Sequence, residues 1–389
     1  MKLLVAHNEY KQPGGEDAVF RSEVQLLRQA GHEVREYVES NHRIGNGNYI
    51  RLGAQTVWND SSRKKLRESI TEFRPHVVHF HNIFPLISPA AYSACQELDI
   101  PTVQTLHNYR LLCPGGLLYR DGGRCEDCLP KRIKWPGVLH ACYRDNTLAT
   151  AAVATTLAVH QSLGTWHEKV TLFVALSEFS RSKFVQGGLP AEKIVVKPNF
   201  VSPDPGERTD TGDYVLFVGR LSAEKGIELL FEAWKKGDRQ IPLRIVGDGL
   251  LQDTLEREKE LAGLNNVFFD GRLERTAALE AMKRARFIVF PSPCYENFPL
   301  VIAEAYACGI PVIASRHGAM AEIIREAVTG LLFEPGSAED FAAKIEWAWT
   351  HTAEMETMGR GARAEFETKY TGEHNYQLLM RIYEQACSA

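Results

Sequence analysis

Residues 287–309, FIVFPSPCYENFPLVIAEAYACG, decide the fold of this chain. The run 287–291 is apolar throughout, as expected for a strand that is buried on both faces of a parallel sheet. A turn with prolines and polar residues follows, and Pro299 suits the first turn of a helix. This order of strand, turn and helix predicts the repeating unit of a parallel sheet covered by helices.

The same unit recurs along the rest of the chain. Near the amino terminus an apolar run leads through Gly14 and Gly15 into a helix, on which Phe20, Val24 and Leu27 form one apolar face. We expect strands at residues 2–7, 76–81, 101–107, 172–177 and 194–197, and again at residues 214–219, 243–247, 267–270, 287–291, 311–314 and 330–333.

The two series are separated by residues 199–212, which are rich in proline and polar residues and have neither a helical nor a strand period. We therefore predict two Rossmann-like, doubly wound domains at 1–198 and 213–370, joined by this linker. A last helix at 371–389 is expected to cross back to the first domain. Ligands of such sheets bind at the carboxyl ends of the strands, so we expect the chemistry in a cleft between the domains.

Composition excludes several classes of protein. The chain has 389 residues, of which 44% are hydrophobic and 24% are charged, which excludes disordered and fibrous proteins. A formal charge of −4 gives no basic footprint for nucleic acid. No signal peptide is evident, and the longest weakly polar stretch, 148–159, is too short to span a bilayer. We expect a cytoplasmic protein, with peripheral contact at the inner membrane face left open.

Two glutamates in the deciding segment are candidate ligand-binding groups. Glu296 lies in the turn, and Glu304 lies one turn into the helix among apolar residues. A buried carboxylate needs hydrogen-bond donors, and ribose hydroxyls would serve. The free amides at the helix start suit a diphosphate or sugar hydroxyls. The alternative is that Glu296 is a surface charge and that Glu304 has partners within the protein.

A second candidate site is the stretch 215–226, VLFVGRLSAEKG, in which Gly219, Arg220 and Lys225 follow a strand. Arginine can hold a diphosphate with two hydrogen bonds, and lysine can hold it as a point charge. The alternative is that both cations are solvated surface residues. Gly247, after the next strand, would allow the backbone to approach a nucleotide closely.

These motifs resemble those of glycosyltransferase family 4, the retaining enzymes of GT-B fold. The resemblance lies in the two glutamates with seven residues between them, in the GRL-x-x-EKG pattern, and in residues 305–324 and 330–345. It implies transfer of a hexosyl unit from a UDP- or GDP-sugar to a glycan or lipid-linked glycan in cell-surface polysaccharide synthesis, without a catalytic metal.

The resemblance also implies roles for single residues. Glu296 would contact the donor sugar near its reacting face, Glu304 would bind the ribose, and Arg220 and Lys225 would hold the phosphates. His107 would position the donor sugar. The remaining donor-binding positions implied by the family are Gly14, Gly15, Arg272, Leu273, Pro299 and Leu300. Many members have glycine where this chain has Pro299, which removes one amide from the helix start.

The reaction course remains open between two alternatives. A front-face reaction, in which the leaving phosphate takes the acceptor's proton, is what the resemblance implies. A double displacement through Glu296 is the other. Two further functions stay open: a nucleotide-sugar 2-epimerase of the same fold and a non-catalytic sugar-nucleotide binding protein. A NAD-dependent dehydrogenase is disfavoured, because neither half carries G-x-G-x-x-G after its first strand.

Four of the eight cysteines lie within thirty residues, at Cys113, Cys125, Cys128 and Cys142. Four thiolates could close a tetrahedral zinc site, which would be structural. Free, partly buried thiols are the alternative. Two basic clusters, at residues 63–67 and 131–134, could hold the protein on anionic lipid, or they could be solvated surface.

Overall fold

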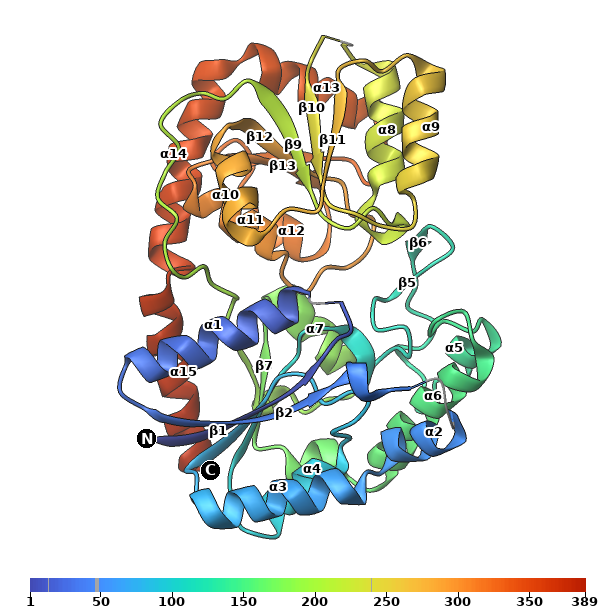
Figure 1. Cartoon of the computed structure of the whole chain (residues 1–389), viewed down its shortest axis with the longest axis vertical. Helices are drawn as coiled ribbons and strands as arrows, with labels where there is room; N and C mark the ends of the chain where they lie inside the picture. The colour runs from blue at the N-terminus through green and yellow to red at the C-terminus, as the bar shows by residue number, and fades with distance from the viewer. Residues whose placement is uncertain (13, 46–48, 239) are drawn as a thin grey trace. The chain divides into compact units, whose positions relative to one another are not determined.

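The computed structural model describes residues 1–12, 14–45, 49–238 and 240–389, which form two compact units (Figure 1). Unit 1 consists of Met1–Arg120, Cys125–Pro198 and Asn375–Ala389. Unit 2 consists of Asp121–Arg124 and Asn199–His374. Each unit is built around its own six-stranded sheet, in which the paired strands are parallel.

The sheet of unit 1 has the strand order β2-β1-β3-β4-β7-β8. The order reverses direction between β1 and β3, so the loops after these two strands diverge and leave a crevice at their carboxyl ends. The strands are β1 (Lys2–Glu9), β2 (Glu33–Ser40), β3 (Val77–Phe80), β4 (Thr102–Thr105), β7 (Leu172–Ala175) and β8 (Ile194–Val196).

The helices of unit 1 follow the strands in the expected alternation. The structure places them at α1 (Gly15–Gln29), α2 (Tyr49–Val57), α3 (Asp60–Phe73), α4 (Ala90–Gln96), α5 (Trp135–Leu139), α6 (Thr147–Ser162), α7 (Glu178–Gln186) and α15 (Gly372–Cys387). Short turns lie at η1 (Asn41–Arg43), η2 (Tyr109–Leu111), η3 (Thr165–Lys169) and η4 (Ala191–Lys193), and a two-stranded hairpin consists of β5 (Tyr119–Arg120) and β6 (Gly123–Arg124).

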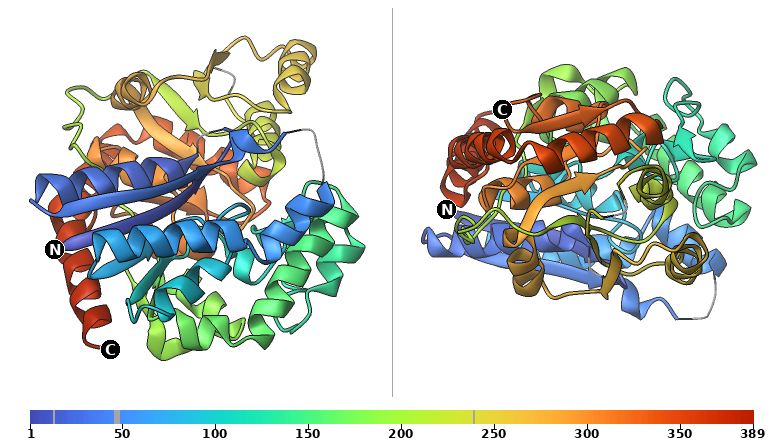
Figure 2. Two further views of the ribbon diagram at one scale, coloured as in Figure 1. Left: turned by 60° about the horizontal axis from the view of Figure 1, so that its bottom comes forward. Right: turned by 90° about the horizontal axis from the view of Figure 1, so that it is seen from above.

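The last helix, α15, packs on the core of unit 1. Leu379, Ile382 and Tyr383 are buried in the same cluster as Leu3 and Phe20. Figures 1 and 2 show α15 beside α1 and β1, which are the first elements of the chain. The carboxyl-terminal residues therefore complete the core that the amino-terminal residues begin.

The sheet of unit 2 has the order β11-β10-β9-β12-β13-β14, in which the chain starts at the centre, builds outward and then returns to build the other side. This is the Rossmann order, with its switch point between β9 and β12. The strands are β9 (Tyr214–Val218), β10 (Leu243–Val246), β11 (Val267–Gly271), β12 (Ala285–Phe290), β13 (Val312–Ser315) and β14 (Gly330–Phe333).

The helices of unit 2 cover this sheet, and their buried faces include the large side chains Phe231, Trp234 and Phe341. They are η5 (Ala223–Lys225), α8 (Ile227–Lys236), α9 (Gln252–Ala262), α10 (Arg275–Lys283), α11 (Leu300–Ala307), α12 (Gly318–Ile323), α13 (Ala338–Thr350) and α14 (Thr352–Lys369). Within the described parts of the chain, no helix has the length and apolar character that crossing a membrane requires.

Candidate functional site

Two of the predicted donor-binding residues of unit 2, Lys225 and Glu296, meet at its switch point. The chain after β9 carries Arg220 and Lys225, and the loop after β12 carries Glu296. Because β9 and β12 are neighbours on opposite sides of the reversal, their following loops diverge and leave room for a ligand. The fold thus explains why two motifs seventy residues apart lie together.

Lys225 and Glu296 form an ion pair, with Nζ 2.7 Å from Oε1. The Ser292 hydroxyl donates to the same oxygen at 3.0 Å. Both side chains are mostly buried, with 22% of Lys225 and 15% of Glu296 exposed. Burial opposes the charge on Lys225, but the Glu296 carboxylate outweighs it, so the pKa of Lys225 is raised. Lys225 is therefore held as a fixed cation.

The second oxygen of Glu296, Oε2, makes no hydrogen bond within the described residues, whereas Oε1 accepts from Lys225, Ser292 and, at 3.8 Å, the Cys294 thiol. A carboxylate fixed through one oxygen can accept a hydroxyl hydrogen bond through the other. Glu296 is thereby suited to bind a polar ligand such as a sugar without leaving Lys225.

Arg220 does not join this pair. Its guanidinium lies 3.1 Å from Glu224, one turn further along, and 64% of its side chain is exposed. Its positive charge is still near enough to oppose protonation of Lys225. Of the two cations predicted to hold the diphosphate, only Lys225 is held in place by its surroundings.

Glu304 lies on α11 with 13% of its side chain exposed. Burial raises the pKa of its carboxyl group, and the nearby Arg275, 3.4 Å away, only partly offsets this. Arg275 begins α10 and was not among the residues predicted from the sequence. Arg275 lies twenty-nine positions before Glu304, so no local sequence pattern links the two. That a buried Glu304 needs a hydrogen-bond donor could nevertheless be expected from the sequence.

The helix that carries Glu304 begins at Leu300, with Pro299 as the residue before its first turn. The Ile302 amide already donates to the Pro299 carbonyl at 3.0 Å. The amides of Leu300 and Val301 have no carbonyl one turn earlier within the helix, so they can bind an anion. Proline at this position has no amide to offer, and Leu300 therefore supplies the first one.

The glycines of unit 2 have a structural reason. Gly247 has a φ of +141°, and a Cβ there would lie 1.9 Å from the Gly219 carbonyl oxygen. The two backbones touch each other, which by itself explains why position 247 lacks a side chain. Arg272 and Leu273 follow Gly271 at the end of β11, with Arg272 exposed and Leu273 half-buried.

In unit 1, Gly14 and Gly15 begin α1 after the first strand. Unlike Gly247, neither is required by packing: Gly14 has an extended φ of −125°, and a Cβ on Gly15 would meet nothing within 4 Å. The Gly14 amide donates to Asp17 at 2.7 Å, and Asp17 also bonds the buried His7 at 2.9 Å. The fold itself gives no reason for this glycine pair.

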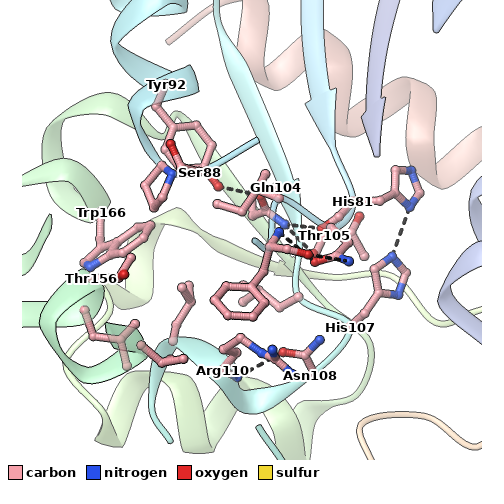
Figure 3. A pocket seen from close by; sticks show the side chains of 18 residues that line it. His81, Ser88, Tyr92, Gln104, Thr105, His107, Asn108, Arg110, Thr156 and Trp166 are labelled. Atoms are coloured by element: carbon pink, nitrogen blue, oxygen red, sulfur yellow. Dashed lines mark hydrogen bonds between the residues drawn. The ribbon is translucent and has the colours of Figure 1, made fainter. Parts of the chain in front are cut away.

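His107 follows β4 and contacts His81, which follows β3. His81 Nδ1 lies 3.0 Å from His107 Nε2, and the two rings stack (Figure 3). Burial lowers the pKa of His81 to about 3 and holds the pKa of His107 well below its usual value. Both imidazoles are therefore neutral at neutral pH, so His107 can accept or donate a hydrogen bond but carries no charge.

Beneath these rings lies a buried ion pair that the sequence did not reveal. Lys197 Nζ is 3.0 Å from Glu23 Oε2, and each side chain is 1% exposed. The other oxygen, Glu23 Oε1, lies 3.2 Å from His79 Nδ1 and 3.2 Å from His81 Nε2. Glu23, His79 and His81 are close enough to ligate a metal together, but Lys197 already neutralises Glu23. A divalent ion would leave an uncompensated charge in this buried place, so the cluster is better suited to orienting the histidines.

Two family models match the chain and together span both units. The model described as Glycosyltransferase Family 4 matches residues 13–205, and the model described as Glycosyl transferases group 1 matches residues 202–365. The chain belongs to glycosyltransferase family 4. The predicted GT-B fold class is confirmed as two parallel-sheet α/β units.

Individual relatives of this family 4 chain are distant. It is 32% identical to the D-rhamnosyltransferase WbpZ of Pseudomonas aeruginosa over 41% of this chain and 42% of that protein. It is 27% identical to the O-antigen chain mannosyltransferase C of Escherichia coli over 45% of this chain and 48% of that protein. The chain thus spans about half the length of the curated relatives it matches.

The solved structure of Anabaena Alr3699/HepE in complex with UDP has the same fold. It superimposes with a TM-score of 0.71, covers 98% of this chain and 99% of its own, and shares 21% identity.

The cysteine cluster of this family 4 chain gives the zinc hypothesis no support. All eight cysteines are free thiols. No three of Cys113, Cys125, Cys128 and Cys142, all of which lie in the described part of the chain, bring their sulfur atoms within 4.8 Å of one another. Burial raises the pKa of Cys128 to about 11, so this thiol is protonated at neutral pH when no metal is bound. Zinc remains a prediction that metal analysis of the purified protein would decide.

The two basic clusters differ in how their charges are placed. In the first, Arg63 lies 2.6 Å from Glu97 and Lys64 lies 2.8 Å from Asp60. In the second, Lys134 is buried and donates to the Cys128 carbonyl at 3.0 Å. The first cluster is therefore a solvated face with paired charges, and Lys134 is a structural residue.

Proposed function

We propose that this chain is a retaining hexosyltransferase that uses a UDP- or GDP-sugar and acts on a glycan or lipid-linked glycan in cell-surface polysaccharide synthesis. The observation that carries the proposal is the Lys225–Glu296 pair at the Rossmann switch point, beside the start of α11. A fixed cation and free helix amides suit a diphosphate, and the open oxygen of Glu296 suits a sugar hydroxyl. The relatives named as sugar transferases and the neighbour solved with UDP support this reading.

In this proposal residues 213–370, which lie in unit 2, bind the donor. The leaving nucleotide diphosphate gains negative charge as the glycosidic bond breaks, so Lys225 and the α11 amides stabilise the transition state more than the ground state. Glu304 accepts hydrogen bonds from the ribose hydroxyls, with Arg275 holding its carboxylate in place. Arg220 turns from Glu224 to the diphosphate when the donor binds.

Residues 1–198, nearly all of which lie in unit 1, bind the acceptor, and the segment 199–212 links them to the donor-binding residues. His107 positions the donor sugar as a neutral hydrogen-bonding group, because burial holds its pKa well below the usual value and keeps the ring uncharged. The acceptor hydroxyl attacks from the face that the phosphate leaves, and the leaving phosphate takes its proton. This course needs no separate base.

We further propose that the chain acts in the cytoplasm at the inner membrane face, where lipid-linked acceptors are found. The support is a group of exposed apolar side chains on and beside α5, namely Ile133, Trp135 and Leu139, next to the cations Lys131 and Arg132. Exposed apolar residues with adjoining basic ones are suited to an anionic lipid surface. Cosedimentation with anionic and with neutral vesicles tests this, and equal failure to bind both would contradict it.

The test of the proposed function is a panel of UDP- and GDP-sugars incubated with the purified chain. We expect the chain to release the nucleotide from one donor slowly without acceptor and faster when membrane-derived acceptor is added. NMR of the product should show that the anomeric configuration of the donor is retained. A new sugar nucleotide formed without acceptor would instead identify an epimerase. Tight nucleotide binding with no turnover for any donor would contradict the proposal.

A further inference from the structure

Arg110 has an unusual setting in unit 1. It lies in η2, three residues after His107, and lines a cavity below the ends of β3 and β4. Its guanidinium carbon is 4.5 Å from the centre of the Phe84 ring and 5.3 Å from that of Tyr143. The two rings stand at 90° with their centres 5.6 Å apart. Two aromatic faces thus fix the plane in which the guanidinium can offer its hydrogen bonds.

That guanidinium lacks an acceptor. Among the described residues it makes no hydrogen bond and no ion pair, and its Nε is buried without a partner. Of the five N–H donors of this group, the one on Nε is held away from water without an acceptor, which costs free energy. The site is therefore built to hold a cation in place without satisfying it.

The nearest carboxylate does not fill this role. Glu16 is close enough to feel the charge of Arg110, but its oxygens are taken by Asn108 at 2.8 Å and Tyr10 at 3.1 Å. Burial raises the pKa of Glu16, so its negative charge is disfavoured there. The positive charge of Arg110 is left for a ligand.

The cavity has a shape that matches this reading. Figure 3 shows Arg110 and Asn108 at one end and the aromatic side chains of Tyr92 and Trp166 at the other. Its volume is about 70 Å³, measured as space open to the centre of a water molecule. That is more than a single water molecule needs, and it leaves room for a carboxylate or phosphate group.

We propose that Arg110 binds an anionic group, a carboxylate or a phosphate, of the acceptor. The proposal rests on the proposed function, since it names the class of acceptor that this transferase uses. A planar guanidinium can bind either anion with two parallel hydrogen bonds, whereas neutral sugars offer no such partner. Acidic glycans and phosphate-linked acceptors both carry such groups.

The test compares Arg110→Gln, Arg110→Lys and the matched control Arg144→Gln. Arg144 contacts the same Tyr143 ring, at 5.3 Å, but is exposed and does not line the cavity. The probes are glucuronate and glucose 1-phosphate, with methyl glucoside as the neutral comparison. Binding is measured as the shift in Tm of the full chain, with and without saturating UDP and GDP. Nucleotide release from the donor alone is measured in parallel.

We expect the anionic probes to raise the Tm of the wild-type chain and of Arg144→Gln, with the shift lost in Arg110→Gln and reduced in Arg110→Lys. A larger Tm shift with glucuronate would indicate a carboxylate-bearing acceptor, and a larger shift with glucose 1-phosphate would indicate a phosphate-bearing one. Equal shifts in wild type and Arg110→Gln would overturn the proposal, as would competition by UDP and GDP, which would assign the anion to the donor. If Arg110→Gln does not fold, an unaltered shift in Arg110→Lys decides against it.

Failure of this proposal and failure of the proposed function give different results. Arg110→Gln should keep the slow release of nucleotide from the donor, because Arg110 touches none of the residues of unit 2 assigned to it. Loss of donor turnover in the wild-type chain itself would contradict the proposed function, whatever the anions do.

Discussion

At the scale of single residues, the donor site depends on the Lys225–Glu296 pair. If one partner is replaced, the other is left mostly buried without its counter-charge. If both are replaced, no unpaired charge remains. The two roles differ: the lysine is assigned to the diphosphate and the glutamate to the sugar. Substitutions can therefore separate a structural pair from a functional one.

We predict that Lys225→Gln lowers the rate of transfer by about 10²-fold or more, because a fixed cation beside the leaving diphosphate is lost. The Tm should change little for the double variant Lys225→Gln/Glu296→Gln, in which no unpaired charge remains. Steady-state kinetics and thermal melts of both proteins measure this. A Lys225→Gln enzyme with near-wild-type turnover would remove Lys225 from the site.

Glu296 substitutions distinguish the two reaction courses. If the carboxylate only hydrogen-bonds the donor sugar, Glu296→Gln should retain more activity than Glu296→Ala, since an amide still forms hydrogen bonds. If the carboxylate attacks the sugar, both variants should be equally inactive, because an amide is no nucleophile. Single-turnover rates of the two variants decide between these outcomes.

Glu304 gives a prediction in which stability and binding move in opposite directions. Its pKa is raised in the folded chain, so above its ordinary pKa the folded state bears the cost of a buried charge. We expect Glu304→Gln to be as stable as wild type or more stable at neutral pH, with the difference vanishing below about pH 4.5. Nucleotide affinity should fall at the same time. A variant that lost stability and kept its affinity would contradict the ribose assignment.

Gly15 offers a further test, because the fold does not require glycine there. Alanine is the better helix former, so Gly15→Ala should fold with an unchanged or higher Tm. If a ligand approaches this helix start closely, the added methyl group should lower transfer by about 10- to 100-fold. Unchanged kinetics would show that the glycine pair has no ligand role.

Several of these residues could be predicted and others could not, for a physical reason. Glu296, Glu304 and Lys225 stand in local patterns of strand, turn and helix, which a sequence displays. Arg275 and the Glu23–Lys197 pair act through partners far away in the chain, 174 positions in the latter case. Such pairs form only when the chain folds, and they give no periodic pattern in the sequence.

At the scale of elements, the strands of both sheets were predicted within a few residues, except for β2. Its sequence, EVREYVES, has four charged residues in eight positions, so it lacks the apolar run of its neighbours. It is an edge strand that pairs with β1 along its whole length, Lys2 with Glu33 through Glu9 with Ser40. Edge strands have one solvated side and tolerate charged residues, so a search for apolar runs does not detect them.

The helix α15 provides the element-scale prediction. Leu379 is fully buried in the core of unit 1, whereas Arg381 on the same helix is exposed. Leu379→Ala should lower the free energy of unfolding by about 2–5 kcal/mol. Arg381→Ala should change it by no more than about 0.5 kcal/mol. Chemical denaturation of both variants checks this, and similar values for the two would show that α15 does not stabilise the unit.

At the scale of the whole molecule, the buried histidines of unit 1 should make stability depend on pH. The pKa of His81 is about 3 in the folded chain, below its ordinary value of 6.5, because burial opposes the charged form. Between these values the folded state binds fewer protons than the unfolded state, so stability falls as the pH falls. The loss is at most about 1.4 kcal/mol per pH unit for one such group. Glu23, whose pKa is held well below 4.5 by Lys197 against the cost of burial, adds to the loss at lower pH.

We therefore expect the free energy of unfolding to be lower at about pH 5 than at about pH 7.5, and the difference to be smaller in His81→Gln. Urea denaturation at the two pH values measures both quantities. The same slope in wild type and variant would show that His81 is not held neutral by the fold.

The central claim is that the switch point of unit 2 binds the nucleotide diphosphate of the donor. A crystal structure of the full chain with UDP or GDP tests it most directly. We predict the diphosphate within hydrogen-bonding distance of Lys225 and the first amides of α11, with the ribose hydroxyls on Glu304. A nucleotide bound at any other place, with Lys225 and Glu304 contacting only protein, would contradict the account.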